Sequence, residues 1–490
     1  MTFAVSMTDL LTVLLLSSVY LISRFINLTA LPVFGDEAIY IRWSQIIKSV
    51  ETLRFIPVTD GKQPLFMWAT VPFFKIIADP LFASRTLSVL SGLGILLCIY
   101  LILRLIFKTT PLVAFIGGYL YLISFFSFFF DRLATADTLL SFFTTLSLFL
   151  VFLLAKHPRL DTSLILGGTL GLAWLTKSPA LYFIVLNFVI FILYNYKKIQ
   201  LCVYPIISTI IATAFYNILR LGPQFNQLAS RNKDYVWPIS EIIKHPLDPF
   251  KPHLSDTITI YSQYFPPLFL ITITLLFVLY ILKKPKIKLD TISLILWFGL
   301  PLVATLSLAK VFTARYILFT LPPFIILVTL LFSQFSKIKY FNIFVLIYLS
   351  TNLFKIWNFE TNLFNYHLPS TETGYIQDWT SGWGIKPSAD FLIDRSKTAN
   401  VIVGTEGYFG TLPDGLQIYT NNITHLTVFG VGIGFEKIPE KLIDAHNHGD
   451  EVYILGNSSR IRLLPDEIQK LTLINTFPKP NNDSLVLYRL

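Results

Sequence analysis

The stretch "PLFMWATVPFFKIIADPLF", residues 64–82, decides how the whole chain is arranged. It is apolar, but it is short, it carries Lys75 and Asp79, and it contains three prolines. A membrane-spanning helix needs about 20 mostly apolar residues, and a proline inside a helix removes a backbone hydrogen bond. Whether this stretch crosses a membrane determines the side on which every later loop lies.

The composition around this stretch is that of a polytopic membrane protein. Of the 490 residues, 54% are hydrophobic and 14% are charged, whereas a soluble domain has about 25% charged residues. The net charge of +10 comes largely from short basic clusters between apolar runs, such as "YKK" at 196–198 and "KKPKIK" at 283–288. This pattern is typical of cytoplasmic loops and not of a nucleic-acid-binding surface.

Eleven other segments are apolar enough to be membrane spans: 8–26, 86–107, 112–130, 138–155, 161–176, 180–196, 201–219, 262–282, 290–309, 316–335 and 340–356. The first segment has neither a basic N-terminal region nor a small-residue cleavage site, so we expect a retained helix and not a signal peptide. Cys98 and Cys202 both lie in apolar segments, so no disulfide framework is expected.

The charges of the loops indicate that 64–82 does not span. If it does not, the basic residues of the loops fall on one side, as the positive-inside rule requires: Arg104, Lys108, Lys156, His157, Arg159, Lys197, Lys198, the 283–288 cluster, Lys337 and Lys339. We therefore predict eleven spans, a cytoplasmic N-terminus, and a membrane-surface or re-entrant helix at 64–82. The remaining charged residues then gather at the outer face, which indicates a site there: Asp36, Glu37, Lys62, Arg132, Asp137, Lys177, Lys310 and Arg315.

After residue 356 the composition becomes polar and the pattern changes. Short β-rich runs, "ANVIVGT", "GLQIYT", "EVYILGN" and "SLVLYRL", alternate with helical stretches, "PSADFLIDRSK" and "PDEIQKLTL". We predict two domains: a helical membrane domain at 1–356, whose first outer loop at 27–85 carries juxtamembrane helices, and an extracytoplasmic α/β domain at 357–490.

The adjacent carboxylates Asp36 and Glu37 stand in "VFGDEAIYIRW", directly after the first span. One interpretation is structural, because an acidic residue at the start of the helix "EAIYIRWSQIIKSV" caps it and is favoured by the helix dipole. The other interpretation is chemical, because a carboxylate at the membrane surface is well placed to accept a proton. The two interpretations are compatible.

Several basic residues stand at the start of an expected helix or at the end of an expected span, on the same outer face of the membrane. Lys62, in "DGKQPLFMW", precedes the helix expected at Pro64, so lysine and helix N-terminus together favour an anion such as phosphate; the alternative is a lysine snorkelling at the interface. Arg132 and Asp137, in "FDRLATADTL", are either a structural ion pair or, for the arginine, a phosphate-binding fork.

The other candidate residues have weaker patterns. Lys177 precedes a proline at another outer helix start, and Arg315 and Tyr316 lie at the outer end of a span, where anchoring in the interface is an alternative for each. The pair His446 and His448 in "AHNHGD" is better explained by a solvated turn than by a metal site. The sequence requires no cofactor, and nothing in it supports a divalent cation.

Six motifs in order resemble those of the bacterial PMT-like glycosyltransferases of the GT-C class, relatives of the protein O-mannosyltransferases and of the aminoarabinose transferase that modifies lipid A. The motifs are "GDEAIY", "GKQPLFMW", "SRTLSVLSG", "DRLATADTLLSF", "GLAWLTKSPALYF" and "RYILFTLPP". The resemblance covers residues 8 to about 330; the usual "KPP" or "HPP" is "KQP" here, which leaves the lysine in place.

The resemblance implies a GT-C fold and an inverting transfer of a sugar from a polyprenyl-phosphate donor on the outer side of the cell membrane. Asp36 matches the catalytic acidic position, and Glu37 is its neighbour. Lys62 matches the lysine that meets the donor phosphate, with Arg132 supporting the phosphate site and Asp137 structural. We add Arg315 and Tyr316 as donor-phosphate candidates and Lys177 as a supporting residue.

Transfer of a sugar from a phosphate requires one general base and no general acid. A phosphate is already a tolerable leaving group, so cations that stabilise its growing charge suffice, and one carboxylate can take the proton of the acceptor hydroxyl. The expected partners are the donor, a protein, lipid or glycan acceptor, and membrane lipids, but no nucleic acid. The alternatives are a transporter or lipid flippase, which would place charges at mid-membrane on broken helices, and an inactive PMT-like scaffold.

Overall fold

The computed structural model describes residues 6–335 and 341–490, and it describes side chains in all of these except 341–347. Lys337 and Lys339, which supported the predicted topology, lie outside the described residues. The chain divides into two compact units. The helical unit consists of the N-terminal residues up to Ile26, Phe55–Phe66 and Arg85–Trp357; the mixed unit consists of Asn27–Arg54, Met67–Ser84 and Asn358–Leu490.

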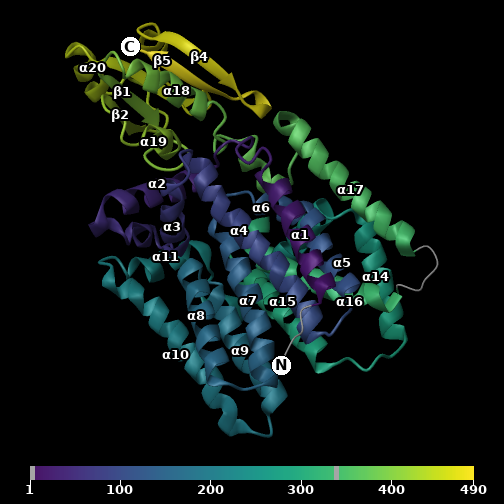
Figure 1. Cartoon of the computed structure of the whole chain (residues 1–490). Coiled ribbons are helices and arrows are strands. Elements are labelled where there is room, and N and C mark those ends of the chain that lie inside the picture. Colours follow the sequence, from purple (N-terminus) through teal and green to yellow (C-terminus); the bar gives the residue numbers. More distant parts are fainter. Residues whose placement is uncertain (1–5, 336–340) are drawn as a thin grey trace. The chain divides into compact units, whose positions relative to one another are not determined.

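The helical unit is a bundle of helices (Figure 1). Its helices are α1 (Met7–Phe25), α4 (Pro80–Leu101, continued by a π-helix at Ile102–Ile106), α5 (Pro111–Ile123), α6 (Phe125–Phe130), α7 (Ala136–Lys156), α8 (Leu160–Thr176), α9 (Ala180–Asn195), α10 (Val203–Asn217), α11 (Gln227–Tyr235), α12 (Ile239–Lys244), α13 (Phe250–Tyr264), α14 (Pro267–Leu282), α15 (Leu289–Leu308), α16 (Leu321–Phe335) and α17 (Phe341–Thr361).

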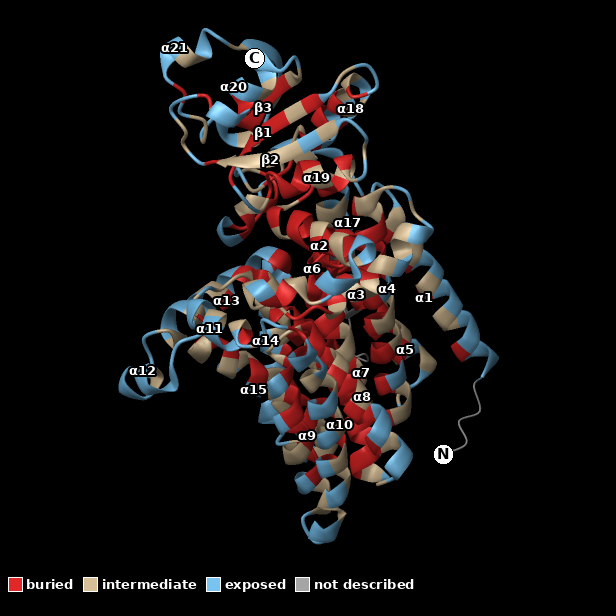
Figure 2. Ribbon diagram, turned by 90° about the vertical axis from the view of Figure 1, so that its left-hand side faces the viewer, coloured by how far each residue is buried: buried red, intermediate tan, exposed pale blue. Residues whose placement is uncertain are grey.

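Six helical segments among the described residues are both long and apolar enough to cross a membrane: Met7–Phe25, Pro80–Ile106, Ala136–Lys156, Ile199–Leu221, Leu289–Leu308 and Ala314–Phe335. The shorter helices α5, α8 and α9 are apolar as well. Figure 2 shows that α7 is lined with buried residues, and 72% of its apolar window is buried, against 22% for α1. α7 is therefore an inner helix of the bundle, whereas α1 exposes leucine and isoleucine side chains that suit contact with lipid.

Three predicted segments are broken in the structure, and proline explains two of them. The third is the predicted span 112–130, which divides into α5 and α6 at Ser124. The stretch 64–82 is not one helix but α3 (Leu65–Thr70) followed by a 3₁₀ turn at Val71–Lys75, and it is not among the helices long enough to span. The predicted span 262–282 is broken, because α13 ends at Tyr264, α14 begins at Pro267, and the two helices meet at 114°. A proline cannot donate the backbone hydrogen bond that would continue a helix through it.

The mixed unit is built around a five-stranded sheet in the order β2-β1-β3-β5-β4. The strands are β1 (Val401–Glu406), β2 (Leu426–Gly432), β3 (Glu451–Asn457), β4 (Thr472–Pro478) and β5 (Ser484–Arg489). β1 pairs in parallel with both β2 and β3, whereas β5 is antiparallel to β3 and to β4. The helices of this C-terminal part are α18 (Ile385–Arg395), α19 (Asp414–Thr420), α20 (Glu440–Asn447) and α21 (Pro465–Ile468).

The predicted C-terminal elements are correct in part. "ANVIVGT", "EVYILGN" and "SLVLYRL" contain β1, β3 and β5, and "PSADFLIDRSK" lies in α18. "GLQIYT" was predicted as a strand but belongs to α19, which follows Pro413; its alternating buried side chains, Leu416 and Ile418, gave a misleading period-two pattern. "PDEIQKLTL" is helical only at Pro465–Ile468, and its last residues begin β4.

The first loop after α1 packs in the mixed unit, a grouping that the sequence did not indicate. Its helix α2 (Gly35–Ser49) lies against α19. Gln45 Nε2 donates a hydrogen bond of 2.8 Å to the Ile418 carbonyl, and Arg42 Nη1 donates one of 2.7 Å to Asn421 Oδ1. These bonds tie the helix that carries the acidic pair to the α/β sheet layer.

Candidate functional site

The acidic pair begins α2, and its two carboxylates have different environments. Glu37 is fully buried, and its Oε2 accepts a hydrogen bond of 3.0 Å from the backbone N–H of Phe34, the residue that precedes the helix. This bond satisfies a backbone donor just outside the helix, so the capping role falls to Glu37. Asp36 is only half-buried, so it is the more exposed residue of the pair.

The backbone around the pair is fixed by a segment of the same unit. Gly35 N donates a hydrogen bond of 3.0 Å to the Thr380 carbonyl, and Phe34 forms a β-bridge with Ser381. A Cβ at Gly35 would meet Thr411 Oγ1 at 3.0 Å, which is tighter than ordinary contact. A glycine at this position therefore allows the start of α2 to approach the loop that follows β1.

In the helical unit, the structure brings four of the predicted residues together. Lys177 Nζ lies 2.5 Å from Asp137 Oδ1 and 4.3 Å from the centre of the Tyr316 ring. The Arg315 guanidinium lies 5.3 Å from the same ring. Asp137 is buried, whereas Lys177 is partly exposed, so the aspartate holds the lysine in place, as expected of a structural partner.

Lys62 belongs to a loop that reaches the same segment. Gln63 Nε2 donates a hydrogen bond of 2.7 Å to Ser178 Oγ, next to Lys177. Lys62 Nζ lies 3.5 Å from Asp60, whose carboxylate also accepts a hydrogen bond of 2.7 Å from Arg231. The loops "DGKQP" and "TKSP" are therefore neighbours, and they supply lysines from two separate parts of the sequence.

Arg132 has a different set of contacts. Its Nη2 donates a hydrogen bond of 2.9 Å to the Ile26 carbonyl just past the end of α1, and its guanidinium lies 4.6 Å from the centre of the Phe128 ring. A cation at the C-terminal end of a helix is favoured by the helix dipole. Arg132 thus joins the end of α1 to α6. Lys310 lies 5.0 Å from the centre of the Trp237 ring.

Next to Arg132 lies a buried polar cluster that the sequence analysis missed. Arg24 and Asp131 are both fully buried, with Nε and Oδ2 3.9 Å apart. Tyr20 and Tyr121 donate hydrogen bonds of 2.8 and 3.0 Å to the Asp131 carboxylate. The available signal was a charged residue at each of two apolar segment ends, in "ISRF" and "FFDR", since such residues are costly in an apolar region unless they are paired.

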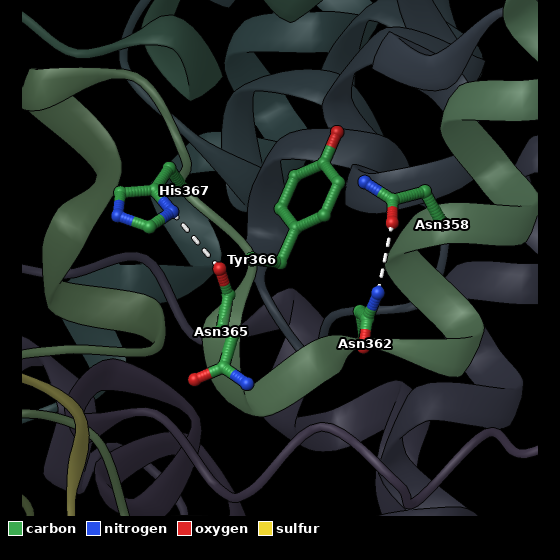
Figure 3. Close-up of a pocket in the computed structure, with 5 residues that line it drawn as sticks. All are labelled: Asn358, Asn362, Asn365, Tyr366 and His367. Atoms are coloured by element: carbon green, nitrogen blue, oxygen red, sulfur yellow. Dashed lines mark hydrogen bonds between the residues drawn. The ribbon is translucent and has the colours of Figure 1, made fainter.

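A cavity of about 490 Å³ lies in the mixed unit, directly after the apolar part of α17, and Figure 3 shows its lining. Asn362 Nδ2 donates a hydrogen bond of 3.2 Å to Asn358 Oδ1, and the His367 ring nitrogen Nδ1 donates one of 2.9 Å to the Asn365 carbonyl. The fifth lining residue is Tyr366, and burial raises its pKa to about 12. No lysine, arginine or carboxylate is among these five, so the cavity lacks the groups expected of a phosphate site.

Comparisons with known proteins agree with the fold. Residues 61–219 match the family model described as dolichyl-phosphate-mannose-protein mannosyltransferase. The crystal structure of ArnT from Cupriavidus metallidurans bound to undecaprenyl phosphate is similar, with 14% identity, a TM-score of 0.58 and 97% of each chain covered. The apo ArnT structure has 14% identity and a TM-score of 0.60 over 97% of each chain.

A more distant similarity is to the crystal structure of the Archaeoglobus fulgidus oligosaccharyltransferase in complex with Zn and sulfate. Its identity is 12% and its TM-score 0.50, over 91% of this chain and 68% of that one. In a comparison with curated proteins, none matches the sequence. The chain therefore has the fold of the GT-C class of membrane glycosyltransferases, and the predicted resemblance to PMT-like members of that class is confirmed.

Proposed function

We propose that the chain is an inverting glycosyltransferase that moves a sugar from a polyprenyl-phosphate donor to an acceptor on the outer side of the membrane. The observation that carries the proposal is the division of roles at the start of α2. Glu37 is buried and caps the helix, whereas Asp36 is half-buried, so the more exposed Asp36 is the carboxylate proposed to act on a substrate. The undecaprenyl phosphate named for the ArnT structure supports a polyprenyl-phosphate donor.

In the proposed reaction, an acceptor hydroxyl attacks the anomeric carbon of the donor sugar, and the bond from that carbon to the phosphate oxygen breaks. The phosphate leaves with the electron pair, and Asp36 takes the proton of the hydroxyl. Lys62 binds the leaving phosphate, with Arg315 and Tyr316 completing the phosphate side. Such preorganised cations stabilise charge that develops in the transition state.

The remaining predicted residues hold the proposed phosphate-binding residues in place. Lys177 is paired with Asp137 and placed over the Tyr316 ring, so it orders the phosphate side. Arg132 fixes the end of α1 through the Ile26 carbonyl, and it supports the phosphate site through that contact. We place the enzyme in the cell membrane as a multi-pass protein, with a cytoplasmic N-terminus and an extracytoplasmic C-terminal domain.

The test compares two adjacent substitutions, Asp36→Asn and Glu37→Gln, in the full chain in membranes. Mass spectrometry of polyprenyl-phosphate sugars and of glycans, in cells with and without the protein, first identifies the donor that accumulates and the product that disappears. Asp36→Asn should abolish product formation while the protein folds normally. Unaltered transfer in Asp36→Asn would remove Asp36 from the mechanism, and sugar–lipid levels that do not respond to the protein would favour a scaffold. Movement of the lipid without transfer would favour a flippase.

A further inference from the structure

The sheet of the mixed unit has a topological switch point at the carboxyl ends of two parallel strands. From β1 the chain continues to β2 on one side and then to β3 on the other side. In open α/β sheets, ligands bind outside the carboxyl ends of the strands at such a point. The residues that end these two strands are Glu406 of β1 and Asn457 of β3.

Both residues are polar and buried, with 2% of Glu406 and none of Asn457 exposed. Asn457 Nδ2 donates a hydrogen bond to Glu406 Oε1, and Arg460 Nε lies 3.3 Å from Glu406 Oε2. Asn457 Oδ1 has no hydrogen-bond partner among the described residues. Buried polar atoms are normally satisfied, so an unpartnered amide oxygen at a switch point indicates a place for a donor from a ligand.

A lysine completes this buried floor. Lys479 is 3% exposed, and its Nζ donates a hydrogen bond to the Ser381 carbonyl. Burial lowers its pKa to about 8, whereas the nearby carboxylates of Asp483 and Glu406 favour its charged form. Burial also raises the pKa of Glu406. The floor thus combines two cations, Arg460 and Lys479, with the carboxylates of Glu406 and Asp483, and Asp378 adds a third carboxylate near Lys479.

The rim above this floor is aromatic. The Arg460 guanidinium lies 3.8 Å from the centre of the Trp379 ring, and 40% of Trp379 is exposed. Tyr408, two residues after Glu406, is 76% exposed. A Cβ at Gly432, where φ is +111°, would meet the Tyr408 hydroxyl at 3.0 Å, so glycine allows the tyrosine to lie across the end of β2.

One short segment of the same unit connects these residues with the acidic pair. On one side, Ser381 accepts the hydrogen bond from Lys479. On the other side, the Thr380 carbonyl accepts hydrogen bonds from Gly35 N at 3.0 Å and from Thr411 Oγ1 at 3.1 Å. The carboxyl edge of the sheet therefore lies beside the start of the helix that carries Asp36.

We propose that Glu406, Asn457, Arg460, Lys479 and Trp379, here called the carboxyl-edge cluster, bind a neutral saccharide of the acceptor and present it to Asp36. A sugar hydroxyl both donates and accepts hydrogen bonds, so it can donate to Asn457 Oδ1 and accept from the guanidinium of Arg460. The exposed ring of Trp379 can cover an apolar C–H face of the sugar. The carboxylates near Arg460 and Lys479 already match both cations, which favours a neutral ligand over a phosphate. This inference rests on the proposed function, since it assigns the acceptor side of the same site.

The test is saturation-transfer-difference NMR on the full chain in lipid nanodiscs. The probes are the methyl glycosides of mannose, glucose, galactose and N-acetylglucosamine, with glycerol phosphate as an anionic comparison. At least one glycoside should receive saturation from the wild-type protein. Arg460→Gln and Trp379→Phe should weaken that binding by about tenfold or more, the usual effect of losing a charged hydrogen bond or an aromatic contact.

The control is Arg462→Gln, which removes the same charge from an exposed position two residues away and should leave glycoside binding unchanged. Melting temperatures equal to that of the wild type establish that each variant is folded. The inference would be overturned if the wild-type protein gave no glycoside signal, or if Arg460→Gln gave the same glycoside signal as the wild type. A response to glycerol phosphate alone would overturn the assignment of a neutral ligand. Asp36→Asn separates the two proposals: it should abolish transfer and retain glycoside binding, whereas retained transfer would remove the proposed base and leave the saccharide site in place.

Discussion

Replacing Gly92 by alanine should destabilise the helical unit, because this glycine allows the buried Asp131 cluster to contact α4. A Cβ at Gly92 would lie 2.0 Å from the Tyr20 hydroxyl and 2.6 Å from the Asp131 carboxyl group. Both groups are fully buried and hydrogen-bonded to each other at 2.8 Å, so neither can move without losing a partner. Overpacking costs about 1–3 kcal/mol, and a lost buried hydrogen bond costs about 1–3 kcal/mol more.

We therefore expect Gly92→Ala to lower the free energy of unfolding by about 2–6 kcal/mol. The matched control is Gly168→Ala in α8, where a Cβ would meet nothing within 4 Å. Alanine has the higher helix propensity, so the control should be neutral or stabilising by up to about 1 kcal/mol. Thermal and denaturant unfolding of both variants in the same nanodiscs, followed by tryptophan fluorescence, measures the difference.

A second substitution identifies the cause of the destabilisation. Tyr20→Phe removes the hydroxyl that the new methyl group would meet. The double variant Tyr20→Phe/Gly92→Ala should therefore lose less stability than the sum of the two single variants, by more than about 0.5 kcal/mol. Gly92→Ala as stable as the wild type, or strictly additive effects in the double variant, would refute the reasoning.

Three further predictions concern the proposed chemistry and the mixed unit. Asp36→Asn should lower kcat by about 10²–10⁴-fold with an unchanged melting temperature. Glu37→Gln should mainly lower the free energy of unfolding, by about 1 kcal/mol, because Glu37 caps the helix. Equal losses of kcat in both variants would contradict the division of roles. Lys62→Gln should raise the KM for the polyprenyl-phosphate donor about tenfold. Lys62→Arg keeps the positive charge and should bring this KM most of the way back to the wild-type value. An effect confined to the KM for the acceptor would argue against phosphate binding by Lys62. Burial raises the pKa of Asp414 from 3.8 to about 6, so its folded form binds a proton more tightly than the unfolded chain. The contribution of Asp414 to the free energy of unfolding is therefore lost as the pH rises from 3.8 through 6. Asp414→Asn should be more stable than the wild type at pH 7 but not at pH 4, as measured by chemical denaturation.

The fold could be predicted from the sequence where the pattern is local. Long apolar runs identified the inner helices, and the β-branched runs at β1, β3 and β5 identified those strands, because burial on both faces leaves a continuous apolar signature. β2 and β4 were missed. The burial pattern of β2 is mostly intermediate, and β4 is largely exposed, so neither strand has the apolar content that marks a buried one.

The candidate site could be predicted only in pieces, because its contacts join distant parts of the chain. Order in the sequence showed that Lys62 and Lys177 each precede a helix, but not that the Gln63–Ser178 hydrogen bond makes their loops neighbours. The Arg24–Asp131 pair was hidden for the same reason, since its partners lie 107 positions apart and each alone resembles a charge at the end of a span. A single sequence does not indicate which distant residues contact each other.

The same limit explains why two adjacent carboxylates could not be assigned separate roles from their spacing. Both stand in the first turn of α2, where the helix dipole favours either of them. The deciding feature is the path of the chain just before the helix, because the bridge between Phe34 and Ser381 turns the Phe34 N–H towards Glu37. That bridge is made by the C-terminal part of the mixed unit, more than 300 residues later in the sequence. The residues after 357 therefore do more than form a separate domain: they fix the capping geometry that leaves Asp36 as the more exposed residue of the pair.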